Sequence, residues 1–218
     1  MEALILYFVL FFPGIYAASS PDWLVQGAEA IRTVPFSIIR ELGRTLTYTL
    51  PAMALLLYII SEKKDLSALK AATPQKRDLL PFAAGLPGLI IIGLFVSLLV
   101  SLFSGLASPA RVQGPSGFFA WSVMIFACLG TGYLEETYFR YYLLTKLEKI
   151  IPYLPLRIAF STVLFALCHM HEGPWGVLNA ALAGVFLSVL FIRYRSLHGI
   201  AFAHAGYNIF VYAIGNLV

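Results

Sequence analysis

One charged octapeptide decides the fold, Tyr133-Leu134-Glu135-Glu136-Thr137-Tyr138-Phe139-Arg140. The run before its carboxylates, 112–134, has 23 residues and no charged side chain, which is enough for a helix to cross a bilayer. Apolar residues continue from 141 to 144, so the charges lie inside the hydrophobic band. Ionisable groups in that position are energetically expensive and indicate a functional site. The competing interpretation is that they mark the end of the helix, where it meets water.

The composition is that of an integral membrane protein. Of the 218 residues, 60% are hydrophobic and 12% are charged, whereas soluble domains carry about 25% charged residues. The net charge of +4 is explained by basic loop residues that set topology, so we expect no nucleic-acid partner. Cys128 and Cys168 lie in apolar runs without metal-type spacing, which indicates buried thiols. We expect one membrane-embedded domain over residues 1–218, with a motif-bearing core at about 116–218.

The apolar segments predict an all-α, polytopic transmembrane bundle of about seven spans. Six of them lie near 3–21, 35–61, 79–110, 158–171, 173–192 and 196–218, and one carries the octapeptide. The first segment competes with a signal peptide, because 17–20 resembles a cleavage site, but Glu2 replaces the expected positive n-region. The fifth is short, and its outer part is expected to be a re-entrant bend or a buried half-helix.

The distribution of basic residues predicts a cytoplasmic N-terminus in a multi-pass cell-membrane protein. On a seven-span model, the connections after spans two, four and six hold five, three and two Lys or Arg residues. The other side holds Arg32 and Arg111, or four basic residues if Arg40 and Arg44 are counted there. The side predicted to be cytoplasmic thus holds ten basic residues and the other side at most four, as the positive-inside rule expects.

Three ionisable groups on three helices fall at a similar depth. With a rise of about 1.5 Å per residue, Glu135 lies roughly 15 Å before Lys146, the first basic residue on the cytoplasmic side. By the same rise, His169 lies roughly 18 Å beyond Arg157, and His204 roughly 14 Å beyond Arg195. These depths predict that Glu135, His169 and His204 share one site.

Helical spacing suggests roles for these groups. Glu136 and Arg140 are four residues apart and can pair, which leaves the adjacent Glu135 available for chemistry. His204 and Asn208 have the same spacing and share a helix face. A carboxylate with a histidine can activate water, and a His/Asn pair can stabilise a developing oxyanion. These are the parts of a peptide hydrolase without a covalent nucleophile.

Three motifs in this order resemble the signature of the CPBP family, the CAAX-processing and bacteriocin-processing intramembrane proteases, also called Abi. The motifs are Glu135-Glu136-x-x-x-Arg140, Phe165-x-x-x-His169 and His204-x-x-x-Asn208. The resemblance covers about 120–218, and the N-terminal half matches only in being hydrophobic.

The resemblance implies an intramembrane endopeptidase that hydrolyses a peptide bond in a membrane-associated protein or peptide, at a site reached from the cytoplasm. By resemblance, Glu135 and His169 activate the hydrolytic water, and His204 and Asn208 form the oxyanion hole. Prenylated CAAX proteins, bacterial peptide precursors and C-terminal sorting tails are all compatible substrates.

The resemblance further implies that Glu136 and Arg140 order the site and help to hold the substrate. Two positions depart from the family pattern. Tyr141 follows the motif arginine where a small residue is frequent, and His198 stands near a common tryptophan, which suggests packing or an interfacial position.

The need for a metal is a separate question, since Glu135, His169 and His204 also suit a zinc site. No H-E-x-x-H pair is present, and the third motif ends in Asn, a poor zinc ligand, so a glutamate-dependent mechanism without cofactor is favoured and zinc is the alternative. A non-proteolytic immunity or scaffold protein on the same fold is the alternative function. A proton- or metal-coupled transporter also fits buried charges, but it does not explain the ordered motifs.

Overall fold

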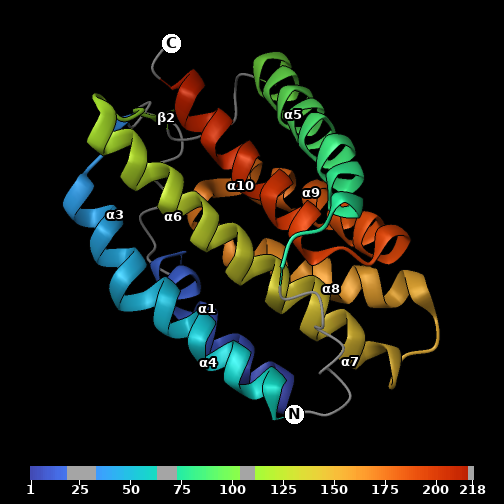
Figure 1. The fold of residues 1–218 in the computed structure, drawn as a ribbon. Coiled ribbons are helices and arrows are strands. Elements are labelled where there is room, and N and C mark those ends of the chain that lie inside the picture. Colours follow the sequence, from blue (N-terminus) through green and yellow to red (C-terminus); the bar gives the residue numbers. More distant parts are fainter. Residues whose placement is uncertain (19–32, 63–72, 104–110, 216–218) are drawn as a thin grey trace.

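The computed structural model describes residues 1–18, 33–62, 73–103 and 111–215, and these form a bundle of seven continuous helical segments (Figure 1). This confirms the predicted all-α helical bundle, and each segment corresponds to one of the seven predicted from the sequence. Arg32 lies outside the described residues, and so do positions 19 and 20 of the stretch that resembles a cleavage site.

The first three segments come from the N-terminal half. They are α1 (Glu2–Ala18), α3 (Ile38–Arg44) continued through a π-helical stretch (Thr45–Thr49) into α4 (Leu50–Ser61), and α5 (Leu79–Leu102) after a 3₁₀ turn (Lys76–Asp78). Two short strands, β1 (Thr33–Val34) and β2 (Arg111–Val112), pair in parallel.

The other four segments form the C-terminal half. They are α6 (Phe118–Glu136) continued through a π-helical stretch (Thr137–Leu144) into α7 (Thr145–Glu148), α8 (Leu154–Cys168), α9 (Gly173–Tyr194) after a 3₁₀ turn (Met170–Glu172), and α10 (Leu197–Ile214). The long α6–α7 segment crosses the front of the bundle, with α10 packed against it and α5 against α9 and α10 (Figure 1).

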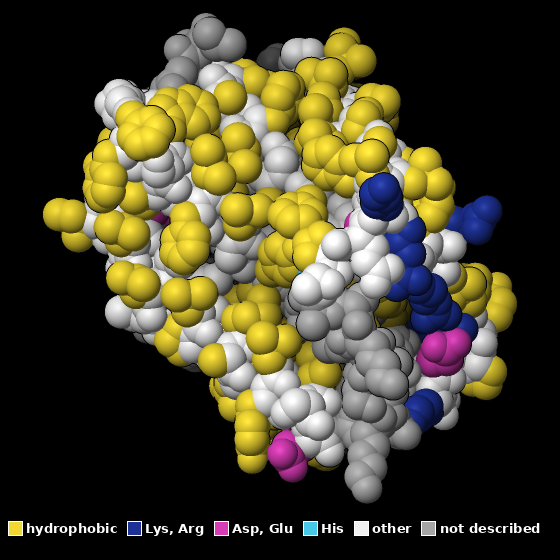
Figure 2. All heavy atoms as spheres, in the orientation of Figure 1, with side chains coloured by type: hydrophobic (Ala, Val, Ile, Leu, Met, Phe, Trp, Pro, Cys, Tyr) yellow, Lys and Arg dark blue, Asp and Glu magenta, His cyan; other side chains and the backbone are white. Residues whose placement is uncertain are grey.

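Four of the segments are long and apolar enough to cross a membrane, which supports an integral membrane protein. They are Ile38–Ser61, Lys76–Leu102, Phe118–Glu148 and Met170–Tyr194. The short segment α8 has 15 residues and ends at a 3₁₀ turn, in agreement with the short fifth span predicted from the sequence. The face drawn in Figure 2 is largely hydrophobic, with Lys and Arg gathered along one edge. Such a surface suits contact with lipid on this face of the bundle.

Two clusters of buried side chains hold the bundle together. The larger one joins α1, α4, the π-helical stretch after α6, and α8, and it includes Tyr7, Leu56, Tyr138, Phe139 and Phe165. The smaller one joins α5, α9 and α10 through residues such as Leu89, Leu187 and Ile200. The larger cluster lies directly beside the octapeptide, because Tyr138 and Phe139 belong to both.

Two details differ from the sequence-based expectations, and a third answers a question that the sequence left open. Lys146 belongs to α7 instead of a loop, because the helix continues past Arg140, and α8 begins at Leu154, before the expected Ile158. In α3, Glu41 is buried and forms ion pairs with the half-exposed Arg40 and Arg44, so the acid faces the protein and the bases face outward.

Candidate active site

The octapeptide lies where α6 changes from an α-helix to a π-helical stretch after Glu136. Wider turns of this kind inside helices are frequent at functional sites. Arg140 Nη1 donates to Glu136 Oε1 over 3.0 Å, and both side chains are fully buried. The structure therefore contains the pair predicted from the spacing of four residues. Because both side chains are buried, these charges lie inside the bundle and not at a water-exposed helix end. A buried arginine requires such a partner.

Arg140 is held on two further sides. Its Nη2 donates to the Gly184 carbonyl of α9 over 3.4 Å, and its Cζ lies 4.3 Å from the centre of the Phe165 ring on α8. Ser188 also donates to the Gly184 carbonyl, over 2.7 Å. A carboxylate, a carbonyl and an aromatic face thus fix the guanidinium. The rigid arginine in turn fixes the carboxylate of Glu136.

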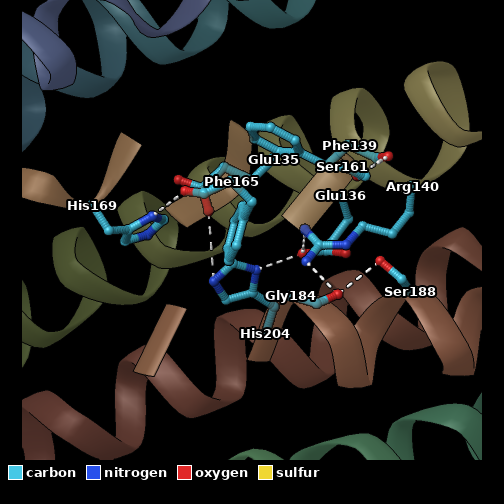
Figure 3. A network of polar contacts seen from close by, with 10 residues as sticks. All are labelled: Glu135, Glu136, Phe139, Arg140, Ser161, Phe165, His169, Gly184, Ser188 and His204. Atoms are coloured by element: carbon cyan, nitrogen blue, oxygen red, sulfur yellow. Dashed lines mark hydrogen bonds and ion pairs between the residues drawn. The ribbon is translucent and has the colours of Figure 1, made fainter. Parts of the chain in front are cut away.

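His204 of α10 lies between the two glutamates (Figure 3). Its Nδ1 is 2.8 Å from Glu136 Oε1, and its Nε2 is 3.7 Å from Glu135 Oε2. An ionised carboxylate only accepts, so Nδ1 carries a proton. Nε2 is the edge that faces Glu135, at a distance longer than a hydrogen bond. The Nδ1 edge of the imidazole is thus fixed by Glu136, and the Nε2 edge is the reactive one.

Close packing of α6 and α10 brings His204 to the glutamates. A Cβ at Gly132 would lie 3.0 Å from the Ala201 carbonyl oxygen and 3.1 Å from the Ala205 nitrogen. A side chain at this position would push the helices apart, so a glycine one turn before Glu136 permits the contact.

His169 is the residue that follows α8, and its orientation comes from its own helix. The backbone N–H of His169 donates to the Ala166 carbonyl, and its Nδ1 is 2.9 Å from the Phe165 carbonyl. A carbonyl only accepts, so Nδ1 carries the proton and Nε2 presents a lone pair. In a neutral His169, Nε2 would thus be the atom that can accept a proton.

Phe165 relates His169 to the rest of the site. Its ring centre lies 4.7 Å from that of His169 and 6.0 Å from that of His204. Among the described residues, no hydrogen bond or ion pair joins His169 to Glu135 or His204. Glu135 and His204 are thus within ion-pair distance of each other, as predicted. His169 lies beside them only by way of the Phe165 ring, which packs against both histidines.

Asn208 lies one turn after His204 on α10 and is half-buried. Within the described part of the chain it has no hydrogen bond to Glu135, Glu136 or His204. His198, one of the residues that departs from the family pattern, packs against α6, which was one of its two expected positions, since its Nδ1 is 2.8 Å from the Tyr133 hydroxyl.

Sequence reasoning missed three contributors to the site. Phe165 was recognised only as part of a motif, and nothing in the sequence indicated that Gly184 and Ser188 would meet Arg140. A glycine within an apolar run is a signal of close helix packing, but it does not name the partner.

A metal centre does not fit the residues as they are arranged. Within the described ranges, no three His, Cys, Asp or Glu side chains are grouped so that they could hold a metal ion. No catalytic step is therefore assigned to a metal here.

One known family matches the part of the chain that contains this site. Residues 117–210 match the family described as type II CAAX prenyl endopeptidase Rce1-like. The family resemblance predicted from the motifs is confirmed. The matched Rce1-like segment begins just before α6 and ends within α10, so it contains all six predicted site residues. No curated protein and no solved structure matches the chain. The match supports a membrane protease of the CAAX type.

Proposed function

We propose that this chain is an intramembrane endopeptidase that hydrolyses a peptide bond in a membrane-associated protein or peptide. One observation carries the proposal: a buried Glu136–Arg140 pair orients His204 so that its free edge faces Glu135, inside the Rce1-like segment. Buried and oriented ionisable groups are costly in a membrane protein, and hydrolysis of a peptide bond gives each of them a role.

Glu135 and His169 would activate the hydrolytic water. Glu135 Oε2 is buried and accepts no hydrogen bond within the described residues, and His169 Nε2 has an available lone pair. A water molecule placed between them would lose a proton to one of these bases as its oxygen attacks the scissile carbonyl. The base would then give this proton to the leaving amine, so the enzyme returns to its starting protonation state.

His204 and Asn208 would stabilise the tetrahedral intermediate. Because Nδ1 of His204 is held by Glu136, a proton on Nε2 would be directed toward the Glu135 side, where the reacting carbonyl would lie. The Asn208 amide, one turn along α10, would supply a second donor to the oxyanion. Removing one such donor typically lowers kcat by about 100- to 1000-fold.

Glu136 and Arg140 would order the site and help to hold the substrate. Their full burial and mutual pairing make them a rigid support for His204. We favour a glutamate-dependent mechanism over a zinc-dependent one, because within the described residues no three His, Cys, Asp or Glu side chains are grouped as metal ligands. The protein would act as one membrane-embedded domain in the cell membrane, with a cytoplasmic N-terminus and a prenylated CAAX tail among the candidate substrates.

The proposal can be tested with purified protein in lipid vesicles and a farnesylated CAAX peptide that becomes fluorescent on cleavage. Glu135→Gln keeps the shape of the side chain but removes the base, so cleavage is expected to fall by about 100-fold or more. Glu148→Gln, a surface glutamate at the end of the same helical segment, is the matched control and should cleave as the wild type does. Equal cleavage by all three proteins would refute the proposal.

A further inference from the structure

The N-terminal helix α1 lies outside the Rce1-like segment, yet it packs against the part of the chain that carries His169. Leu6, Tyr7, Leu10 and Phe11 are buried in the same cluster as Phe165. Contacts join α1 both to α8 and to the 3₁₀ turn that follows it. A helix without motif residues therefore supports the end of α8.

Tyr7 makes a polar contact within this apolar interface. Its side chain is 1% exposed, and its hydroxyl donates to the Leu164 carbonyl of α8 over 2.8 Å. The same hydroxyl lies 3.5 Å from Cys168 Sγ, which is itself 3.3 Å from the Leu164 carbonyl. The three groups form a small hydrogen-bonded cluster that spans the last turn of α8.

This cluster brackets the groups that orient His169. Leu164 precedes Phe165, whose carbonyl receives His169 Nδ1, and Cys168 precedes His169 itself. The last turn of α8 is tightened, since the His169 N–H donates to the Ala166 carbonyl, three residues back, and not to the Phe165 carbonyl. The Phe165 carbonyl is thereby left to the imidazole. Any movement of this turn would change where Nε2 points.

We propose that Tyr7 is a positioning residue for His169: its hydroxyl fixes the last turn of α8 so that His169 Nε2 faces the reacting water. The inference rests on the proposed function, because it assigns a purpose to the orientation of the base. It extends the working site to a helix that the family match does not cover.

The chain offers a matched pair of variants. Tyr7→Phe and Tyr138→Phe each remove one buried hydroxyl that donates to a main-chain carbonyl between α1 and a neighbouring helix, Leu164 in the first case and Ala3 in the second. Both rings belong to the same core cluster and would remain in place. Only the Tyr7 bond reaches the turn that carries His169.

Steady-state cleavage of the farnesylated CAAX peptide in vesicles would be measured for both variants, together with thermal unfolding and the pH dependence of kcat/KM. We expect Tyr7→Phe to lower kcat about tenfold with little change in KM, since a small misplacement of a catalytic group is costly. The limb of the pH profile that reports the base should also move. Tyr138→Phe should keep the wild-type kcat and pH profile while losing a similar amount of thermal stability.

Equal kcat values for the two variants, an unshifted pH profile, or a Tyr7→Phe protein that does not fold while Tyr138→Phe does would each overturn the positioning role. Failure of the proposed function looks different, because Glu135→Gln would then retain full activity. If Glu135→Gln is inactive and the two tyrosine variants are equal, only the role of Tyr7 fails.

Discussion

Glu136 and His204 lie 2.8 Å apart, from Oε1 to Nδ1, and this contact decides which edge of the imidazole faces Glu135. The same Oε1 accepts from Arg140, so one oxygen links α6 to α10 and neutralises a buried guanidinium. Two adjacent glutamates thus have different surroundings. Glu136 Oε1 has two hydrogen-bond partners, whereas Glu135 makes no hydrogen bond among the described residues and lies near the Nε2 edge of His204.

This difference predicts unequal stability effects for the two glutamates. Glu136→Gln leaves Arg140 buried without its counter-charge, which typically costs about 3–5 kcal/mol, so unfolding temperature and activity should both fall. Glu135→Gln should lose activity with little loss of stability. Thermal unfolding in detergent and cleavage of the farnesylated peptide measure the two effects. A stable, active Glu136→Gln protein would contradict the anchoring role.

A second prediction concerns Gly184, whose carbonyl receives Arg140 and Ser188. A Cβ there would lie 3.2 Å from Phe165 Cδ1 and 3.2 Å from Thr162 Cγ2, so Gly184→Ala should push α8 from α9 and cost about 1–3 kcal/mol. Gly43→Ala in α3 is the control, because nothing lies within 4 Å of its Cβ and a helical Gly→Ala change is neutral or stabilising. Chemical denaturation compares the two variants. Equal stabilities would show that α8 and α9 tolerate separation.

The start of α10 gives a third prediction. Ser196 Oγ accepts from the Gly199 N–H over 3.0 Å and donates to the buried carboxylate of Asp78 over 2.6 Å. Ser196→Ala removes both contacts and should cost about 1–2 kcal/mol or more. Ser37→Ala removes a cap on α3 that accepts from Arg40 at an exposed position. The Ser196 variant should unfold at the lower temperature, and the reverse order would argue against a tight connection between α5 and α10.

The metal question gives a fourth prediction. Protein treated with a zinc chelator and then freed of it should cleave the peptide at the untreated rate, because the described residues bring no three His, Cys, Asp or Glu side chains together as metal ligands. The zinc content before and after treatment is the necessary companion measurement. Activity that disappears with zinc and returns when zinc is added would establish the zinc-dependent alternative.

Much of the arrangement could be predicted from the sequence because it depends on local periodicity. The helical bundle follows from apolar runs, and the Glu136–Arg140 pair follows from a spacing of four. Equal depth in the membrane correctly brought His204 to Glu135. Depth alone says nothing about rotation around each helix axis, so it could not show that His204 would contact Glu136 more closely than Glu135.

The remaining features depend on contacts between distant segments. Nothing local distinguishes the π-helical turn after Glu136, and no spacing rule places the Phe165 ring beside His169 and His204. The support of α8 by Tyr7 joins residues more than 150 positions apart, as the separation of 157 between Tyr7 and Leu164 shows. The short pairing of β1 with β2 is equally non-local.

The central claim is that Glu135 is the base of a membrane protease, and the most direct test compares the peptide termini of membrane proteins in cells. Cells producing wild-type protein or Glu135→Gln at matched levels would be analysed by mass spectrometry of new N- and C-termini. The account predicts a defined set of termini that requires Glu135 and names the substrate. Identical termini in both, with the cellular phenotype still rescued by Glu135→Gln, would contradict it and favour a scaffold.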